Sequence, residues 1–175
     1  MTNQMISSQK KSTQLAKYHT EIEQFLSFYL DANQQALLPT QQLFEIVKVS
    51  LGEITAIAGL APSVMGIYNW RGDVIWVVDL ASLLGYKPLY AQLYEQEKLQ
   101  DKCHIIFMRS QDNVIGLAVQ RVGQIVKCDI STIQTSALTF ANPAMMQACR
   151  GYWLSGAEET FLVLDGDAIA EITSK

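Results

Sequence analysis

The chain has 175 residues, of which 49% are apolar and 17% are charged. This length suits one domain or two small, closely packed ones, and the apolar fraction is enough to build a sizeable core. The 17 acidic and 13 basic residues give a formal net charge of -4. Because nucleic-acid binders normally carry a basic stripe, this balance argues against a nucleic acid as partner.

The N-terminal 20 residues differ from the rest of the chain. They contain three lysines and no acidic residue, and they are rich in Ser, Thr and Gln. They lack the apolar segment of a secretory signal, and no run in the chain approaches the ~18 apolar residues of a membrane-spanning helix. We therefore expect a cytoplasmic protein in which residues 1–23 form a flexible tail and residues 24–173 form the folded part.

Deleting residues 1–20 should leave the stability of the folded part unchanged, because these residues offer little apolar surface for burial. The measurement is thermal unfolding of the full chain and of the shortened chain. A loss of about 1 kcal/mol lowers the midpoint by several degrees in a small domain, so a fall of many degrees would contradict the prediction.

Short apolar segments separated by turn residues then follow one another, which is typical of barrels and sandwiches. In the first half the pattern predicts strands over residues 23–31, 36–39, 44–50, 53–59, 66–70 and 73–80. Within 44–50 the alternation places Phe44, Ile46 and Lys48 on one face. The continuous apolar run 74–78 is typical of a strand buried on both faces.

Residues 80–85 read as one helical turn that begins after Asp79 and ends at Gly85. Residues 86–102 interrupt the strand pattern, and their apolar positions have the spacing of a short amphipathic helix. Such a stripe more often packs on the body of a protein than meets a partner. The spaced residues are Leu89, Tyr90, Leu93 and Tyr94.

Strands resume after this connection, and a last helical turn is expected over residues 166–172. Residues 130–136 and 141–148 read as loops or short helices. About ten strands and no long buried helix indicate an all-β fold. The later predicted strands are 103–110, 114–122, 123–129, 149–156 and 160–165.

Motifs of catalysis and cofactor binding are not found. The sequence contains no GxSxG, no P-loop and no GxGxxG. His19 and His104 are far apart, and the Asp-Gly-Asp at 165–167 lacks the further ligands of a calcium loop. The three cysteines are widely spaced without a CxxC, so we expect free thiols rather than a disulfide or a zinc site. We therefore predict no catalytic residue, no metal and no cofactor.

The stretch from Tyr68 to Leu80, "YNWRGDVIWVVDL", places an arginine in a two-residue connection between two apolar strands. Gly72 suits a turn, but a turn does not require an arginine. Together with "LFEIVKV" and "APSVMG" before it, this stretch resembles the CheW-like family, the adaptors of bacterial chemosensory arrays. The matching residues are Glu45, Ile46, Pro62, Gly66, Asn69, Arg71, Gly72, Val74, Val77, Val78, Asp79 and Leu80.

The resemblance implies two five-stranded SH3-like β-barrels packed side by side with short helical connections. In that family the N-terminal strand joins the barrel of the C-terminal half, so the two subdomains are discontinuous in sequence. It also implies a non-enzymatic adaptor that joins the coiled-coil tip of a methyl-accepting receptor to the CheW-like domain of a CheA-type histidine kinase. A response regulator that docks on the same groove is a further partner it allows.

The resemblance places the predicted partner-binding residues around the groove between the barrels. Arg71 is expected to reach over the groove; its alternative is an internal pair with Asp73, Asp79 or Glu45. Leu43 is either an apolar anchor for the partner or an ordinary residue of the hydrophobic core. The predicted set is Leu43, Glu45, Asn69, Trp70, Arg71 and Gly72.

Three positions depart from the family pattern. Trp70 replaces the usual leucine, Trp76 stands where proline is usual, and Gln120 replaces an aspartate. The two tryptophans are core residues or interface anchors. These departures suggest a divergent branch that serves pilus-based motility or phototaxis. The alternative from another class is a small ligand-binding or enzymatic β-barrel protein with a pocket between the barrels.

Overall fold

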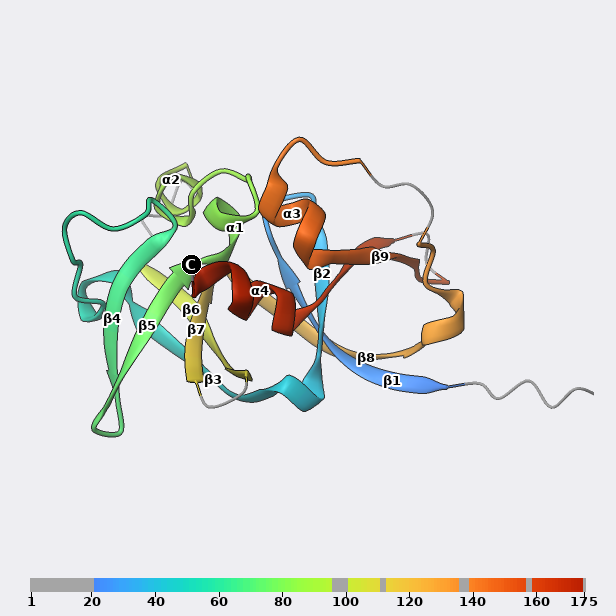
Figure 1. Cartoon of the computed structure of the whole chain (residues 1–175), viewed down its shortest axis with the longest axis horizontal. Helices are drawn as coiled ribbons and strands as arrows, with labels where there is room; N and C mark the ends of the chain where they lie inside the picture. Colours follow the sequence, from blue (N-terminus) through green and yellow to red (C-terminus); the bar gives the residue numbers. More distant parts are fainter. Residues whose placement is uncertain (1–20, 96–100, 111–112, 136–138, 157–158, 175) are drawn as a thin grey trace, which may run out of the picture.

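The structure, a computed structural model, describes residues 21–95, 101–110, 113–135, 139–156 and 159–174. Strands dominate it, and they form two five-stranded sheets that lie side by side (Figure 1). The strands are β1 Ile22–Tyr29, β2 Gln35–Pro39, β3 Leu43–Ser50, β4 Val64–Trp70, β5 Asp73–Asp79, β6 Lys102–Ser110, β7 Asn113–Val119, β8 Arg121–Asp129, β9 Cys149–Leu154 and β10 Thr160–Leu164.

The two sheets differ in how their strands are distributed along the sequence. Sheet B has the order β3-β6-β7-β5-β4 and is made from consecutive strands, whereas sheet A has the order β8-β1-β2-β10-β9 and combines the first two strands with the last three. The pairs β2–β10 and β5–β7 are parallel, and every other pair is antiparallel. The predicted fold of two five-stranded barrels is confirmed. β1 begins at Ile22, slightly before the predicted end of the tail, whose residues 1–20 lie outside the described part.

A shared apolar core joins the two sheets. Phe28 of β1 meets Ile106 and Met108 of β6 there, and all three are fully buried. Each barrel also has a smaller core of its own, around Phe107 in sheet B and around Phe25 in sheet A. Burial of one such side chain contributes roughly 1.5–3 kcal/mol, so the shared core holds the barrels as one body.

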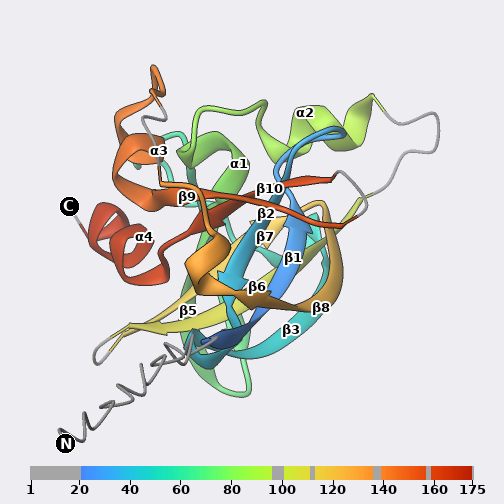
Figure 2. The ribbon, with the colours of Figure 1, turned by 90° about the vertical axis from the view of Figure 1, so that its right-hand side faces the viewer.

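Short helices cover the ends of the sheets. Figure 2 shows α3 and α4 side by side at one edge, where they contribute to the shared core. The carboxylate of Asp79 caps α1 by accepting a hydrogen bond from the Ser82 amide at 3.0 Å, and it accepts another from the Leu89 amide at 2.7 Å. The predicted Asp79 cap is thus present. The helices are α1 Leu80–Leu83, α2 Leu89–Tyr94, α3 Pro143–Ala148 and α4 Gly166–Thr173.

The structure corrects two predictions about strands. Residues 53–59 are not a strand: Ser50 and Glu53 form a capping box that starts a 3₁₀ turn, Leu51–Glu53, and only Thr55 makes an isolated bridge. The run 74–78 is buried on both faces only at its C-terminal end, where Val77 and Val78 are both buried. Val74 is 64% exposed and Trp76 is 46% exposed, because nothing in the described structure covers the outer face of β5 there.

Helix α2 divides its apolar stripe. Leu89 and Leu93 are buried in the core of sheet B, as predicted for packing on the body. Tyr90 and Tyr94 point away from that core and are exposed. The buried face of this helix is therefore narrower than the predicted four-residue apolar stripe. Each tyrosine follows a buried leucine by one position, which turns its side chain toward solvent.

The three cysteines are free thiols in the structure. Burial raises the pKa of the Cys103 thiol to about 11, and burial also raises the pKa of Cys128 and Cys149. A thiol reagent attacks the thiolate, so the native protein at pH 8 should react slowly, with half-buried Cys149 first. Counting thiols under native and denaturing conditions checks this. Unfolding should release all three, and a Cys103 that reacts in the native state as fast as a free thiol would contradict it.

Candidate functional site

The β4–β5 hairpin builds the turn that holds Arg71. Trp70 pairs with Asp73, which leaves Arg71 and Gly72 as a two-residue loop. Both have positive φ, 52° and 95°, as a tight hairpin of the primed type requires. The Asn69 side-chain oxygen accepts a hydrogen bond from the Gly72 amide at 3.1 Å, which fixes the turn. Figure 1 shows this hairpin tip projecting from one end of sheet B.

Arg71 occupies an unfavourable backbone position. Among the described residues it is the one non-glycine residue with a positive φ. A left-handed backbone costs a residue with a side chain about 1–2 kcal/mol, and asparagine or glycine occupies such a turn at lower cost. The turn itself therefore does not explain an arginine here.

Glu45 of β3 pairs with Arg71 across the end of the barrel. Its two carboxylate oxygens lie 3.1 and 3.2 Å from the same guanidinium nitrogen, Nη2. The Arg71 side chain is 69% exposed and that of Glu45 is 28% exposed. An ion pair this open to water contributes about 0–1 kcal/mol, which at most offsets the strain of the turn. The pairing with Glu45 is one of the alternatives that the sequence left open.

Aromatic rings lie directly beneath this ion pair. The Trp70 ring centroid is 4.8 Å from the Arg71 guanidinium carbon and 5.2 Å from the Phe107 ring centroid. Phe44 stands edge-on to Trp70 at 5.5 Å and is 39% exposed. An exposed cation above partly exposed rings offers a binding partner both charge and apolar contact.

A β-bulge explains how Phe44 reaches the rings. The register of β3 against β6 passes from Leu43 opposite Met108 to Glu45 opposite Phe107, so Phe44 is the extra, unpaired residue. The alternation predicts Phe44 on one face with Ile46 and Lys48, but the bulge brings it against Trp70 and Phe107, the cross-strand partner of Glu45, and this contact was not predicted. We name Glu45, Asn69, Trp70, Arg71 and Gly72, with Phe44, the hairpin site.

Leu43 lies elsewhere. It is half-buried and packs against the shared core, opposite Met108. The structure thus brings five of the six predicted residues together and places Leu43 in the packing between the sheets. Sequence reasoning also missed Arg109, whose guanidinium lies 5.5 Å from the Phe44 ring centroid. The adjacent Leu-Phe-Glu sequence is the signal that could have drawn attention to Phe44.

A cavity of about 740 Å³ lies between the sheets, where the alternative function would need one. Its two carboxylates serve local structure. Asp31 accepts hydrogen bonds from the Asn33 and Gln34 amides, and Glu95 pairs with Lys87. Among the described residues, no group of three or more His, Cys, Asp and Glu side chains gathers to hold a metal ion. Both carboxylates of the described lining are thus engaged in local hydrogen bonds or an ion pair.

The model of the CheW-like domain family matches residues 24–173. The chain belongs to the CheW-like domain family. This CheW-like chain is similar in structure to the scaffolding protein TtCheW from Thermoanaerobacter tengcongensis, with a TM-score of 0.70, 20% sequence identity, and coverage of 89% of this chain and 97% of that chain. At this identity the likeness shows a shared fold. No curated protein matches this sequence significantly.

Membership gives the hairpin site its context. The CheW-like family is one of non-enzymatic scaffolding adaptors of chemotaxis signalling. Within the described residues, no helix is both long enough and apolar enough to span a membrane. The hairpin site lies at one end of sheet B of this CheW-like chain.

Proposed function

We propose that this chain is a chemosensory adaptor that couples a methyl-accepting receptor to a CheA-type histidine kinase. The observation that supports it best is Arg71, held in an unfavourable turn and largely exposed above the aromatic rings of the hairpin site. Neither the turn nor its ion pair gains appreciable stability from an arginine. A partner that accepts hydrogen bonds from the guanidinium would explain why an arginine occupies this turn.

The receptor contact we propose uses three kinds of interaction. The Arg71 guanidinium donates to carboxylate or carbonyl oxygens of the receptor's coiled-coil tip. Phe44 and Trp70 supply apolar surface at the same place. Glu45 holds the guanidinium over these rings before the partner arrives, which lowers the cost of ordering the side chain on binding.

The mechanism we propose is geometric. The adaptor binds the kinase through the kinase's own CheW-like domain and sets its position relative to the receptor, so that the receptor's conformation changes the rate of phosphorylation. We further propose that a response regulator docks on the same surface. We also propose that the adaptor serves pilus-based motility or phototaxis. Residues 1–23 act as a tail to the folded part 24–173, and the chain works in the cytoplasm beside receptor arrays.

Capture of partners from cell extract tests the proposal. The full chain, immobilised through its N-terminal tail, should retain a methyl-accepting receptor and a CheA-type kinase. The Arg71→Glu variant should retain less receptor. Capture of neither protein by the wild-type chain would overturn the adaptor function, and equal receptor capture by both chains would remove Arg71 from the contact.

Leu43→Asp is a poor probe of the hairpin site because Leu43 packs on the shared core. We expect it to lower the free energy of unfolding by about 2 kcal/mol or more, since it buries a charge without a partner. Phe44→Ser is the better apolar variant, because Phe44 is partly exposed and unpaired in the bulge. Denaturant unfolding of both variants checks this, and a Leu43→Asp variant as stable as Phe44→Ser would contradict it.

A further inference from the structure

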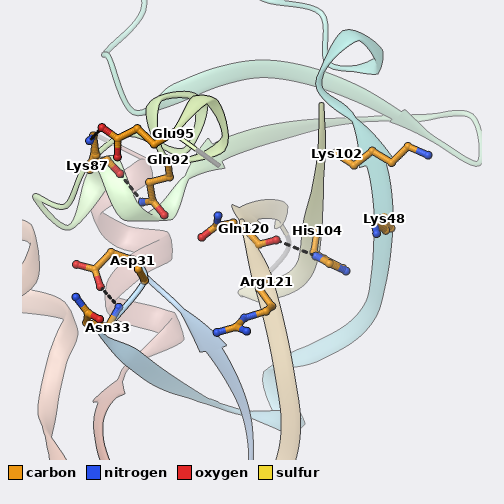
Figure 3. A pocket seen from close by; sticks show the side chains of 11 residues that line it. Asp31, Asn33, Lys48, Lys87, Gln92, Glu95, Lys102, His104, Gln120 and Arg121 are labelled. Carbon is orange, nitrogen blue, oxygen red and sulfur yellow. Dashed lines mark hydrogen bonds and ion pairs between the residues drawn. The ribbon is translucent and has the colours of Figure 1, made fainter. Parts of the chain in front are cut away.

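The cavity between the sheets is lined by basic side chains from both of them. Arg121 comes from β8 of sheet A, Lys48 from β3 of sheet B, and Lys102 and His104 from β6 of sheet B. Figure 3 shows these four on one side of the cavity, with Gln92 of α2 and the β1–β2 turn on the other. The described part of the chain contains eight Lys and Arg residues, and four of them line this one cavity, although the chain as a whole is acidic.

Strand register places three of these groups on one face of sheet B. Lys48 is directly opposite His104, and Lys102 is two residues before His104 on the same strand. The same face continues along β6 into Ile106, which is buried in the shared core. Lys48 and Lys102 are diagonal neighbours on this face, and two like charges so placed repel weakly where water screens them, so an anion between them would be favoured.

Among the described residues, no carboxylate forms an ion pair with Lys48, Lys102 or Arg121, although Asp31 and Glu95 also line the cavity. Ion pairs between described residues involve Arg71, Lys87 and Arg150, and none of them includes Lys48, Lys102 or Arg121. The Asp31 carboxylate accepts from the amides of its own turn, and Glu95 pairs with the fourth cation, Lys87. Lys48, Lys102 and Arg121 therefore line the cavity without an ion-pair partner in the described part of the chain. Figure 3 shows the Lys102 side chain extended away from Arg121, whose guanidinium lies 3.6 Å from the Tyr29 ring centroid, so a ligand would have to draw these side chains together.

A second observation comes from Gln92. This side chain is buried, and its amide nitrogen donates to the carbonyl oxygens of Leu30 and Lys87 at 2.8 and 2.6 Å. Its amide oxygen has no hydrogen-bond partner among the described residues. Figure 3 shows that oxygen on the side of Gln92 that faces the cavity. A buried acceptor of this kind is costly, and a ligand's N–H or O–H group would satisfy it after a small side-chain shift.

We propose that this cavity binds a small organic phosphate that carries two or more negative charges. Its phosphate oxygens accept from the Arg121 guanidinium and from the Lys48 and Lys102 ammonium groups, and a donor group of its organic part approaches Gln92. A cavity of about 740 Å³ is in the size range of small-molecule sites. Because the cations come from both sheets, the ligand bridges the two barrels. This site is distinct from the hairpin site and does not rest on the adaptor function.

Calorimetric titration of the full chain with pyrophosphate and with ADP tests the proposal, at an ionic strength held constant with sodium chloride. Both should bind, and the double variant Lys48→Gln/Arg121→Gln should lose at least about tenfold in affinity for both. Lys127→Gln is the matched control, because Lys127 is an exposed lysine on β8 outside the cavity. Lys102→Gln alone should give a smaller loss of affinity.

Unfolding by denaturant shows whether the variants fold. Removing Lys48 relieves repulsion, whereas removing Arg121 ends its contact with the Tyr29 ring at 3.6 Å, so the stability of the double variant should stay within about 1 kcal/mol of the control. Absence of binding at millimolar pyrophosphate and ADP would overturn the proposal, and so would equal affinities in the double variant and in Lys127→Gln. If the double variant loses affinity only for a captured acidic protein, the cations belong to a protein interface and the small-ligand site is wrong.

Discussion

Replacing Arg71 with glutamate should weaken receptor binding at least about 30-fold and leave the free energy of unfolding within about 0.5 kcal/mol of wild type. The small effect on stability follows from exposure: the Arg71 side chain is 69% exposed, so loss of its pair with Glu45 and the new repulsion are screened by water. The large effect on binding follows from the interface, where a buried charge left without its partner costs about 2–5 kcal/mol.

Two further variants separate the possible roles of Arg71. Arg150→Glu is a matched control, because Arg150 is also an exposed arginine near a carboxylate, at 4.0 Å from Asp165, but it lies on β9 of the other barrel. The exchange Arg71→Glu with Glu45→Arg restores an internal pair with the charges reversed. If the exchange restores binding, Arg71 acts through the pair alone. Titration of each variant with the receptor fragment, beside unfolding in urea, distinguishes these results.

Replacing Gly66 with alanine should lower the free energy of unfolding by about 3 kcal/mol or more. Gly66 has φ 141°, and a Cβ there would lie 2.0 Å from the Thr55 carbonyl oxygen. That oxygen accepts a hydrogen bond from the Ile67 amide at 3.0 Å, and the Thr55 amide donates to the Ile67 oxygen at 2.8 Å. The added methyl group must push this bridge apart, because the atoms that it meets belong to the backbone of Thr55 and Ala56 and cannot rotate away. The loss would also loosen β4, the strand that leads to the hairpin site.

Gly52→Ala is the control for Gly66→Ala. Nothing lies within 4 Å of the Cβ position at Gly52, and its backbone is not in the left-handed region. We expect an effect on stability within about 0.5 kcal/mol. Urea unfolding of both variants is the measurement. A Gly66→Ala protein as stable as Gly52→Ala would show that the Thr55 bridge yields without cost, and the packing described for β4 would then be wrong.

Much of the hairpin site follows from local sequence. Asn69 and Gly72 around a two-residue loop between apolar strands are sufficient to predict a tight hairpin, because few residues adopt positive φ. The Asp79 cap is equally local. The arrangement of the strands into two barrels, one of which combines the first two strands with the last three, came from resemblance to a family, because strand patterns do not show which strand pairs with which.

The errors came from features that depend on tertiary packing. The apolar run 74–78 predicts burial on both faces only if a second layer covers each face, and the outer face near Val74 and Trp76 has no such cover in the described structure. The contact of Phe44 with Trp70 depends on a bulge, which periodicity alone does not locate. At residues 53–59 the Ser50–Glu53 capping box was a local signal that competed with apolar alternation.

The sheet order also has a consequence for synthesis on the ribosome. Sheet B uses strands that follow one another from residue 43 to residue 119, so it can assemble while the rest of the chain is still being made. β1 and β2 are made first, but their neighbours β8 and β10 arrive last. Until then the apolar residues of β1, Phe25 and Phe28 among them, lack their final neighbours, and unpaired strand edges of this kind promote aggregation. In a stalled or truncated chain that lacks β10, the barrel of sheet A therefore stays incomplete around β1 and β2, although all five strands of sheet B are present.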